Sequence, residues 1–543
     1  MESQRSLLFI ALLVVSFLLF QQWQLEHAPI QVQEQNQVTQ ETQSAENNTG
    51  DFVPASSQAQ ASADVVKPSA KMITVTTDVV KVMINTQGGD ITEVALLNYD
   101  TEQGSGIPYT MLQNGARKYI AQSGLTGANG PDRLIPGRPI YQVEKTDYQL
   151  NDQGELTVNL TLNQENGLNI VKTYTFVQGK CDIGLTYTLA NTTTQSASVQ
   201  LYGQLKQSTF VDESSALMPT YRGAAYSTTE ERYEKYDFSD IADANLNQTT
   251  RGGWVAMLEH YFVSAWVPQV GDNNQLYTNY TSNGDAVIGF KAPAITVDAN
   301  QSATASAILY VGPKLQDELE VLADGLDLTV DFGFLFMISQ PLHWLLLAIQ
   351  SIVVNWGVAI IVITLIVKGL MYPLTKAQYT SMAKMRDLQP KMQQLKERFG
   401  DDRQKMGQAT MELYRKEKVN PAGGCLPMLI QMPIFLALYW VFLESVELRH
   451  AGFGLWLTDL SSKDPYYILP ILMGISMFVM QKMQPMTATD PMQQKIMQYM
   501  PVMFTVFFFW FPSGLVLYWL VSNVISIVQM KIIFRGMEKA KQK

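Results

Sequence analysis

A lysine inside an apolar run is the residue of this chain best suited to act on charged groups. Lys368 lies within the run from Val358 to Met371, and Thr364 precedes it by one turn of a helix. An ionisable side chain inside a membrane span is unfavourable by about 2.5–3.5 kcal/mol, so its presence indicates a functional site. The expected chemistry is attraction of acidic groups in a medium of lower dielectric constant than water.

Snorkelling is the alternative explanation for Lys368. The residue lies four positions before Tyr372, about 6 Å along a helix, so its ammonium group can reach the membrane surface and merely anchor the span. The lysine alone does not distinguish these explanations, and its neighbours must do so.

Polar residues in two other apolar segments are candidates for the same site. Gln431 lies in one of them, and Ser522, Asn523 and Ser526 lie in the last. A cation and polar groups inside a membrane must be in contact with water or protein, which predicts a hydrated groove open to the inside. Soft, adaptable side chains are expected to form a hydrophobic slide beside the groove: Met428, Met432, Phe435, Met503, Phe507 and Trp510. Lipid-facing packing is the alternative for each of these.

Nucleotide-driven, metal-dependent and nucleophilic chemistry have no support in the sequence. The chain has no G-x-x-x-x-G-K-[ST] phosphate loop, no H-E-x-x-H zinc motif and no G-x-S-x-G nucleophile elbow. Its four histidines are scattered, at His27, His260, His343 and His450. We therefore expect no metal site, no cofactor and no hydrolytic activity.

Charge is divided unevenly along the 543 residues, which assigns segments to the two sides of a membrane. Residues 25–340 hold 17 Lys and Arg against 36 Asp and Glu, whereas residues 376–418 hold 11 against 6. Residues 531–543 hold 5 against 1. Because positively charged loops stay in the cytoplasm, we expect residues 26–354 to be exported and both termini to remain inside.

The basic residues on the inside form an expected docking surface for RNA or anionic headgroups. Apolar residues at alternating spacings of three and four predict two amphipathic helices, over residues 385–399 and 406–413, joined into a hairpin at 400–402. The alternative explanation for these apolar residues is a hairpin that packs on itself and exposes a solvated basic surface. The docking candidates are Lys384, Arg386, Lys391, Lys396, Arg398, Arg403, Lys405, Lys531, Arg535, Lys539, Lys541 and Lys543.

Six membrane spans are expected to position these residues. An uncleaved anchor at 1–25 precedes a flexible, low-complexity linker at 26–70, because no small-residue cleavage site follows the first apolar run. Beyond the exported domain the pattern predicts an interfacial helix at 331–354, a second span at 355–374, the cytoplasmic hairpin at 375–419, four spans within 420–531 (426–443, 466–481, 495–511 and 513–531) and a basic tail at 532–543. Because both termini are expected on the inside, the chain must cross the membrane an even number of times, and six spans meet this condition.

Residues 71–330 carry the pattern of a large all-β domain. Apolar and polar residues alternate at 73–76, 156–162 and 303–311, and turn signals such as Gln87-Gly88-Gly89-Asp90 separate the runs. Period two with frequent turns predicts antiparallel sheets packed as a sandwich, closed by a short helix at 313–323.

Four motifs resemble the YidC/Oxa/Alb family of membrane-protein insertases. They are Lys368-Gly-Leu-Met-Tyr-Pro-Leu-Thr-Lys376, Asn420-Pro-Ala-Gly-Gly-Cys-Leu-Pro427, Gln431-Met-Pro-Ile-Phe-Leu-Ala437 and Phe511-Pro-Ser-Gly-Leu-Val-Leu-Tyr518. Over its whole length the chain is similar to the six-span members of Gram-negative bacteria. The resemblance implies an α-helical polytopic protein of the inner membrane, with a five-helix core around a hydrophilic groove and an exported β-supersandwich similar to mutarotase-like folds.

The same resemblance implies an activity and partners. It implies an insertase and chaperone that moves hydrophobic segments of nascent membrane proteins into the phospholipid bilayer, alone or with the Sec translocon, and aids their folding. The ribosome and the signal-recognition receptor are the expected partners of the basic inside surface. The family usually has arginine where this chain has Lys368, so the charge is kept while the bidentate guanidinium geometry is lost.

Two other function classes compete with this one. A solute-coupled transporter is disfavoured because the spans hold one buried cation, no central carboxylate and no matching halves. A tethered carbohydrate enzyme or lectin would depend on the β-domain alone, where no acid/base pair is evident. Measurement of solute flux in proteoliposomes tests the transporter class, and measurement of sugar binding by residues 71–330 tests the carbohydrate class.

Overall fold

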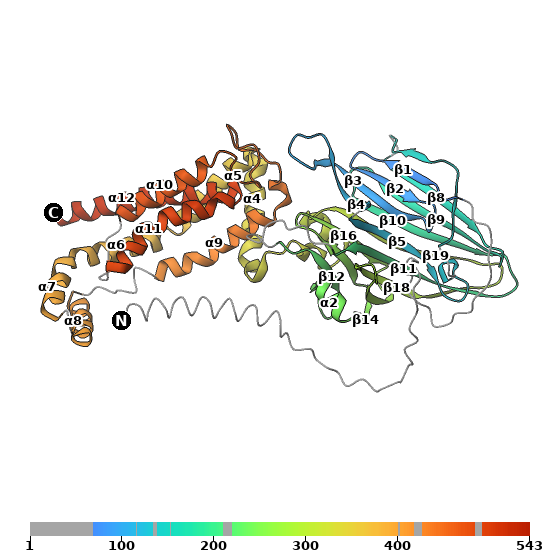
Figure 1. Cartoon of the computed structure of the whole chain (residues 1–543), viewed down its shortest axis with the longest axis horizontal. Coiled ribbons are helices and arrows are strands. Elements are labelled where there is room, and N and C mark those ends of the chain that lie inside the picture. The colour runs from blue at the N-terminus through green and yellow to red at the C-terminus, as the bar shows by residue number, and fades with distance from the viewer. Residues whose placement is uncertain are drawn as a thin grey trace.

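The computed structural model places a β-domain and a helical body at opposite ends of an elongated molecule (Figure 1). It describes residues 69–115, 117–133, 138–151, 154–209, 220–399, 402–417, 426–483 and 491–542. The expected anchor at 1–25, nearly all of the linker at 26–70 and the glycine-rich motif at 420–425 lie outside these residues.

The predicted β-sandwich is confirmed, with two mostly antiparallel sheets that enclose an apolar core. The first sheet has the order β14 (Asn247–Arg251), β17 (Asn273–Tyr280), β18 (Asp285–Val297), β11 (Ala197–Ser208), β5 (Lys118–Thr126), β4 (Pro108–Asn114), β3 (Asp90–Asp100), β2 (Val80–Asn85), β1 (Met72–Thr76) and β7 (Asp147–Gln149). The second has the order β13 (Glu234–Tyr236), β12 (Gly223–Ser227), β15 (Trp254–Leu258), β16 (Phe262–Pro268), β19 (Ser302–Pro313), β10 (Asp182–Asn191), β9 (Leu168–Val177), β8 (Glu155–Asn163) and β6 (Gln142–Val143).

The alternation in β9 shows how the sequence builds this core and also places a cation inside it. Successive side chains of a strand point to opposite faces, so Leu168, Ile170, Tyr174 and Phe176 are all buried. The antiparallel register with β10 is continuous through this stretch. Lys172 occupies an inward position of the same series and is fully buried.

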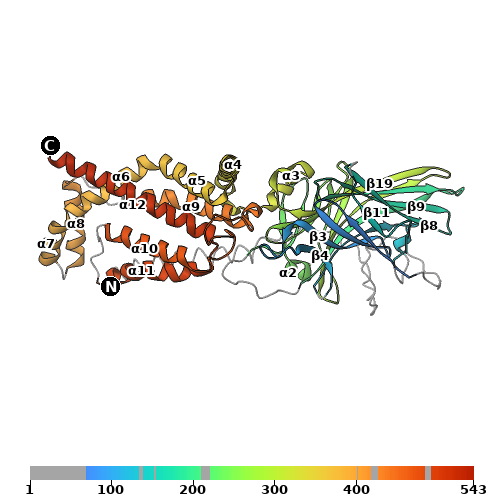
Figure 2. The same ribbon diagram turned by 90° about the horizontal axis from the view of Figure 1, so that it is seen from above.

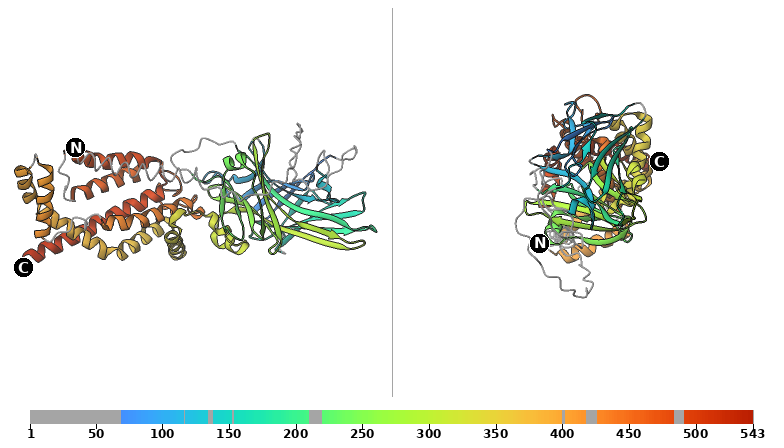
Figure 3. Two further views of the ribbon diagram at one scale, coloured as in Figure 1. Left: turned by 90° about the horizontal axis from the view of Figure 1, so that it is seen from below. Right: turned by 90° about the vertical axis from the view of Figure 1, so that its right-hand side faces the viewer.

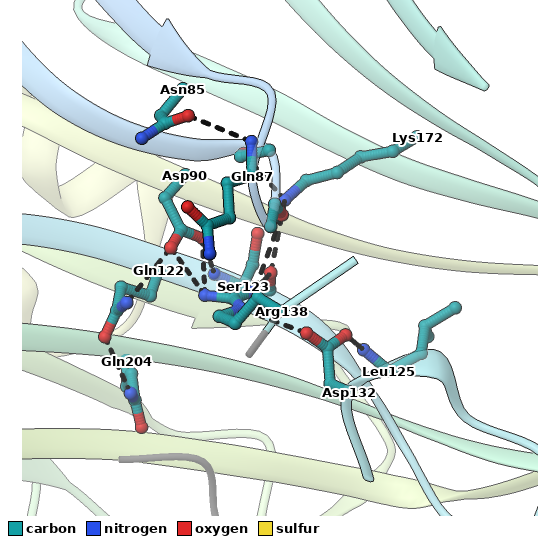
Figure 4. A network of polar contacts seen from close by, with 12 residues as sticks. Asn85, Gln87, Asp90, Gln122, Ser123, Leu125, Asp132, Arg138, Lys172 and Gln204 are labelled. Carbon is teal, nitrogen blue, oxygen red and sulfur yellow. Dashed lines mark hydrogen bonds and ion pairs between the residues drawn. The ribbon is translucent and has the colours of Figure 1, made fainter. Parts of the chain in front are cut away.

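Backbone oxygens surround the ammonium group of Lys172 (Figure 4). Its Nζ donates hydrogen bonds to the carbonyls of Gly88, Gly89 and Ser123 at 2.9, 2.8 and 3.2 Å. Both glycines have positive φ, so the predicted turn between β2 and β3 presents both carbonyls to the lysine. Burial lowers the pKa of Lys172 to about 7.

A buried arginine ties the same turn to its surroundings. Arg138 Nη1 donates to Asp90 Oδ1 at 2.7 Å, and Nε donates to Asp132 Oδ1 at 2.9 Å. Its Nη2 donates to the carbonyl of Ser123 at 2.6 Å. This polar network of Lys172, Arg138, Asp90 and Asp132 cross-links both sheets.

Helices make up most of the remaining described chain. Two short helices, α2 (Phe238–Asp243) and α3 (Gln316–Leu322), belong to the β-domain. The helical body contains α4 (Phe336–Val353), α5 (Trp356–Leu370), α6 (Tyr372–Asp387), α7 (Gln389–Phe399), α8 (Arg403–Lys416), α9 (Leu426–Glu444), α10 (Ile468–Met483), α11 (Pro491–Phe507) and α12 (Ser513–Gln542). Figures 2 and 3 show α7, α8 and the C-terminus at the end of this body that is remote from the β-domain.

The predicted inside hairpin differs from the structure in its first helix. This helix is divided, because α6 ends at Asp387 and α7 begins at Gln389. Pro390 favours the division, since proline lacks a backbone donor and is best accommodated in the first turn of a helix, where α7 places it. The Asp402 carboxylate accepts from Lys405 N at 3.1 Å and caps α8, which packs on α7. Residues 400–401 of the predicted corner lie outside the described residues.

Two described helices, Gly333–Val353 and Ser513–Lys539, are long and apolar enough to cross a membrane. A third span results if α5 and α6, which meet at a 64° bend next to Pro373, cross together. Ile430–Glu444 and Ile468–Met483 are shorter apolar helices. The six-span count and the interfacial placement of α4 therefore stay predictions. The expected tail at 532–543 continues α12 as a helix up to Gln542.

Candidate functional site

The start of α5 is fixed to the loop that follows α9, and this sets the position of Lys368. Asn355 caps the helix by accepting from Val358 N at 2.9 Å, and its Nδ2 donates to the carbonyl of Phe453 at 3.1 Å. Gly357 permits this contact, because a Cβ there would lie 2.1 Å from the Phe453 ring. Lys368 then falls in the last turn of α5, facing α12.

The ammonium group of Lys368 is buried with one neutral side-chain partner. Its side chain is 7% exposed, and Nζ donates to Ser526 Oγ at 3.0 Å. Gln529 Nε2 donates to the backbone carbonyl of Lys368 at 3.2 Å. Among the described residues, no carboxylate forms an ion pair with this lysine. A positive charge is thus held inside the helical body without a countercharge among the described residues.

The row of polar residues on α12 continues toward α10. Asn523 Nδ2 donates to Ser476 Oγ at 3.0 Å, and this hydroxyl in turn donates to the carbonyl of Met473 at 2.6 Å. Asn523, Ser526 and Gln529 follow one another at intervals of three, so they lie along one side of α12. The row connects α5 with α10 through hydrogen bonds.

The other groove candidates have different surroundings. Thr364 is fully buried and donates to the carbonyl of Ile360 in its own helix at 2.5 Å. Gln431 on α9 and Ser522 on α12 are half-buried. Within the described chain, the structure gives none of these three a hydrogen bond to Lys368.

Ser476 and Gln529 also belong to the row of polar residues, and neither was predicted from the sequence. A signal for Gln529 was present, because Ser522, Ser526 and Gln529 recur at the four- and three-residue spacing of one helix face. No comparable pattern marks Ser476.

Most residues of the expected hydrophobic slide are exposed outside the protein core. Exposure runs from 45% for Phe507 to 64% for Met503, with Met432 and Trp510 between them. Phe435 differs, since it is half-buried against Trp519 with ring centroids 4.6 Å apart. The side chain of Met428 lies outside the described part of the chain.

The basic candidates gather at the end of the helical body that carries α7, α8 and the end of α12 (Figure 1). Exposed there are Lys384, Arg386, Lys391, Arg398, Lys405, Lys531, Arg535 and Lys539. Lys391 pairs with Glu417, Lys405 with Asp402, and Arg386 lies 5.3 Å from the Phe534 ring centroid. The side chains of Lys396, Arg403 and Lys541, and all of Lys543, lie outside the description.

Comparison with known proteins accounts for both parts of the molecule. A family model described as "60Kd inner membrane protein" matches residues 348–541, and one described as "YidC periplasmic domain" matches residues 72–345. The chain is 55% identical over 542 residues to a membrane protein insertase YidC of Shewanella loihica, and 54% identical over 546 residues to one of Aeromonas salmonicida. Each alignment covers 99% of both chains. A crystal structure of an active YidC insertase matches with a TM-score of 0.37 at 19% identity, covering 85% of this chain and 92% of that one.

Proposed function

The chain belongs to the YidC family of membrane protein insertases, and on that premise we propose that Lys368 draws the acidic end of a substrate into a groove between α5, α10 and α12. The protein is an insertase of the inner membrane that acts on nascent membrane proteins and carries an exported β-domain. The observation that supports the proposal is the buried ammonium group with Ser526 as its side-chain partner and no described countercharge.

The energetics require no nucleotide hydrolysis by this chain. A substrate carboxylate that replaces water near Lys368 interacts more strongly than it would in bulk solvent, because the effective dielectric constant is lower. The membrane potential favours outward movement of a negative charge by about 2.3 kcal/mol per 100 mV. Burial of about 20 apolar residues in lipid then makes the transfer favourable overall.

The exposed residues Met432, Met503, Phe507 and Trp510 provide the path for the hydrophobic segment. Flexible thioethers and aromatic rings adapt to apolar segments of varied shape, so one surface serves many substrates. A segment that moves along this surface enters the lipid while its polar end passes Asn523 and Ser526. Gln431 and Ser522 contribute to the groove as half-buried polar groups.

Charge substitution at Lys368 tests this proposal. We expect Lys368→Arg to retain insertion and Lys368→Glu to lower insertion of single-span reporters with acidic exported tails by about tenfold, since a hydrogen bond to a charged group contributes about 1.5–3 kcal/mol. The measurement is depletion of the resident insertase and complementation by each variant. Lys463→Glu reverses an exposed charge in the segment between α9 and α10, apart from the groove and from the basic docking residues, and is the matched control. Normal insertion of acidic-tailed reporters by Lys368→Glu would contradict the proposal.

The exposed basic residues of α6, α7, α8 and α12 support docking of the translating ribosome or a targeting receptor on the inside, with both termini cytoplasmic. Attraction to RNA weakens as salt rises, because phosphate contacts release counterions. Co-sedimentation with ribosome–nascent-chain complexes over a salt series, with and without residues 531–543, measures this contribution. Salt-independent binding that survives the truncation would assign these charges to orientation alone. Cooperation with the Sec translocon is a further part of the proposal.

A further inference from the structure

A cavity of about 80 Å³ lies where the β-domain meets the exported end of α9. Trp440 and Glu444 of α9 form one side, and the β-domain contributes Tyr233, Lys235 and Lys314. Asp331, just before the start of α4, also lines it. The cavity therefore adjoins three parts of the molecule that are far apart in sequence.

Two groups of opposite charge, Lys314 and Glu444, face this cavity and lie close enough for the carboxylate to favour the charged form of the lysine. Lys314 is 4% exposed and Glu444 is 6% exposed, yet among the described residues neither head group has a hydrogen bond or an ion pair. The buried hydroxyl of Tyr233 also has no partner. Lys235, by contrast, pairs with Asp331 and lies 4.7 Å from the Tyr221 ring centroid.

Such an arrangement favours a polar occupant. A buried charge without a partner is strongly unfavourable, and removal of one member of a buried pair is destabilising for the same reason. Burial lowers the pKa of Lys314, while the neighbouring Glu444 favours its charged form. The volume exceeds the share of about 30 Å³ that one water takes in the liquid, so the cavity has room for more than one water or for a small polar group.

The charges and the location of the cavity define the chemistry of the occupant. An ammonium group and a carboxylate, neither with a hydrogen bond or an ion pair among the described residues, complement a group that itself carries a negative and a positive charge. The helix that begins beside Asp331 exposes Phe336, Met337 and Trp344, and exposed tryptophan is typical of headgroup depth in a membrane. The cavity thus lies close to the exported surface of the bilayer.

We propose that this junction cavity binds an aminoalkyl phosphate group, as carried by the headgroup of phosphatidylethanolamine. The phosphate receives hydrogen bonds from Lys314 and from the hydroxyl of Tyr233. The ammonium group contacts the carboxylate of Glu444 and the ring of Trp440, which supplies a cation–π contact. A bound headgroup would link the β-domain to α9 at the membrane surface, independently of the groove around Lys368.

Calorimetric titration of the delipidated full-length protein in detergent tests this site. The probes are short-chain phosphatidylethanolamine, phosphatidylglycerol and phosphatidylcholine, together with free phosphoethanolamine. We expect phosphatidylethanolamine to bind most tightly, and Glu444→Gln and Lys314→Gln each to weaken that binding by about tenfold, as expected for loss of one charge-assisted contact. Asp324→Asn, which removes a carboxylate that is 82% exposed and pairs with Arg232, is the control and should bind normally.

The charge-reversed double variant Lys314→Glu/Glu444→Lys distinguishes a missing charge from a folding defect in the single variants. Because it keeps both charges in the cavity, it should restore the binding that each single variant loses. Equal binding of the three lipids, or binding unchanged in both single variants, would overturn the proposal, because Lys314 and Glu444 would then not recognise the headgroup. Free phosphoethanolamine binding as tightly as the lipid would assign the site to the soluble compound instead of the membrane.

Discussion

Two buried lysines, one in each half of the molecule, have opposite surroundings. Lys172 in the β-domain donates to three backbone carbonyls and lies beside the carboxylates of Asp90 and Asp132. Lys368 in the helical body donates to the hydroxyl of Ser526 and has no described countercharge. Burial alone therefore does not identify a functional cation.

The number of partners separates the two roles. The ammonium group of Lys172 uses all three of its donors inside the protein, so it cross-links the fold and offers nothing to a ligand. Lys368 uses one donor on a side chain and leaves others for water or a substrate. We infer that the first lysine stabilises structure and that the second acts on substrates.

The largest expected effect comes from removing a charge beside Lys172. Asp90→Asn leaves Arg138 without a principal countercharge, and breaking a buried pair in this way is unfavourable by about 3–5 kcal/mol. We expect a lower free energy of unfolding of the β-domain, measured as faster hydrogen exchange in β3 and β5. Lys368→Met, compared in the same protein, should leave exchange in these strands unchanged. Equal exchange in Asp90→Asn and the unaltered protein would show that the network is not structural.

A second expected effect is a rise in stability of the β-domain with pH. Burial holds the pKa of Lys172 near 7 in the folded chain, below its ordinary value of 10.5, so the unfolded chain binds more protons between these values. Stability then rises with pH above about 7, by at most about 1.4 kcal/mol per pH unit. Denaturant unfolding at pH 7, 8 and 9 measures the slope. Lys172→Met should flatten it, and an identical slope in both proteins would contradict this account.

The smallest expected effect concerns the partner of Lys368. Ser526→Ala removes one hydrogen bond to a charged group, which contributes about 1.5–3 kcal/mol, but water in the groove can replace the hydroxyl and restore most of this contribution. We expect insertion of acidic-tailed reporters to stay within about threefold of the unaltered protein, a smaller change than the one expected for Lys368→Glu. Complete loss of insertion would mean that Lys368 depends on Ser526 as Lys172 depends on its backbone acceptors. The two lysines would then not differ in their need for partners inside the protein.

Sequence predicted one lysine and missed the other for a physical reason. Lys368 is conspicuous because it interrupts an apolar run, whereas Lys172 lies in a strand whose other residues alternate normally. The three carbonyl groups that accept hydrogen bonds from Lys172 come from a turn more than eighty positions away and from β5, so no local pattern reveals them. The sandwich was predictable because alternation is local, and the division at Leu388 was missed although Pro390 marks it.

The groove candidates show the same limit. Asn523 and Ser526 were predictable as polar residues on one helix face, but their contacts with Ser476 and Lys368 depend on how α5, α10 and α12 pack. Thr364, one turn before Lys368, satisfies its hydroxyl within its own helix instead. Spacing along one helix therefore identified the face without identifying the partners.

A charge-swap cycle at Lys368 tests the central claim most directly. The measurement compares insertion of two single-span reporters, one with an acidic exported tail and one with a lysine-containing tail, by the unaltered protein and by Lys368→Glu. For each protein, insertion of the acidic-tailed reporter is divided by insertion of the lysine-tailed reporter. Dividing the value for the unaltered protein by the value for the variant removes the effect of the membrane potential, which acts on each tail equally in both proteins. We predict that the preference shifts toward the lysine tail by at least about tenfold in the variant. An unchanged preference would show that the charge of Lys368 does not act on the substrate.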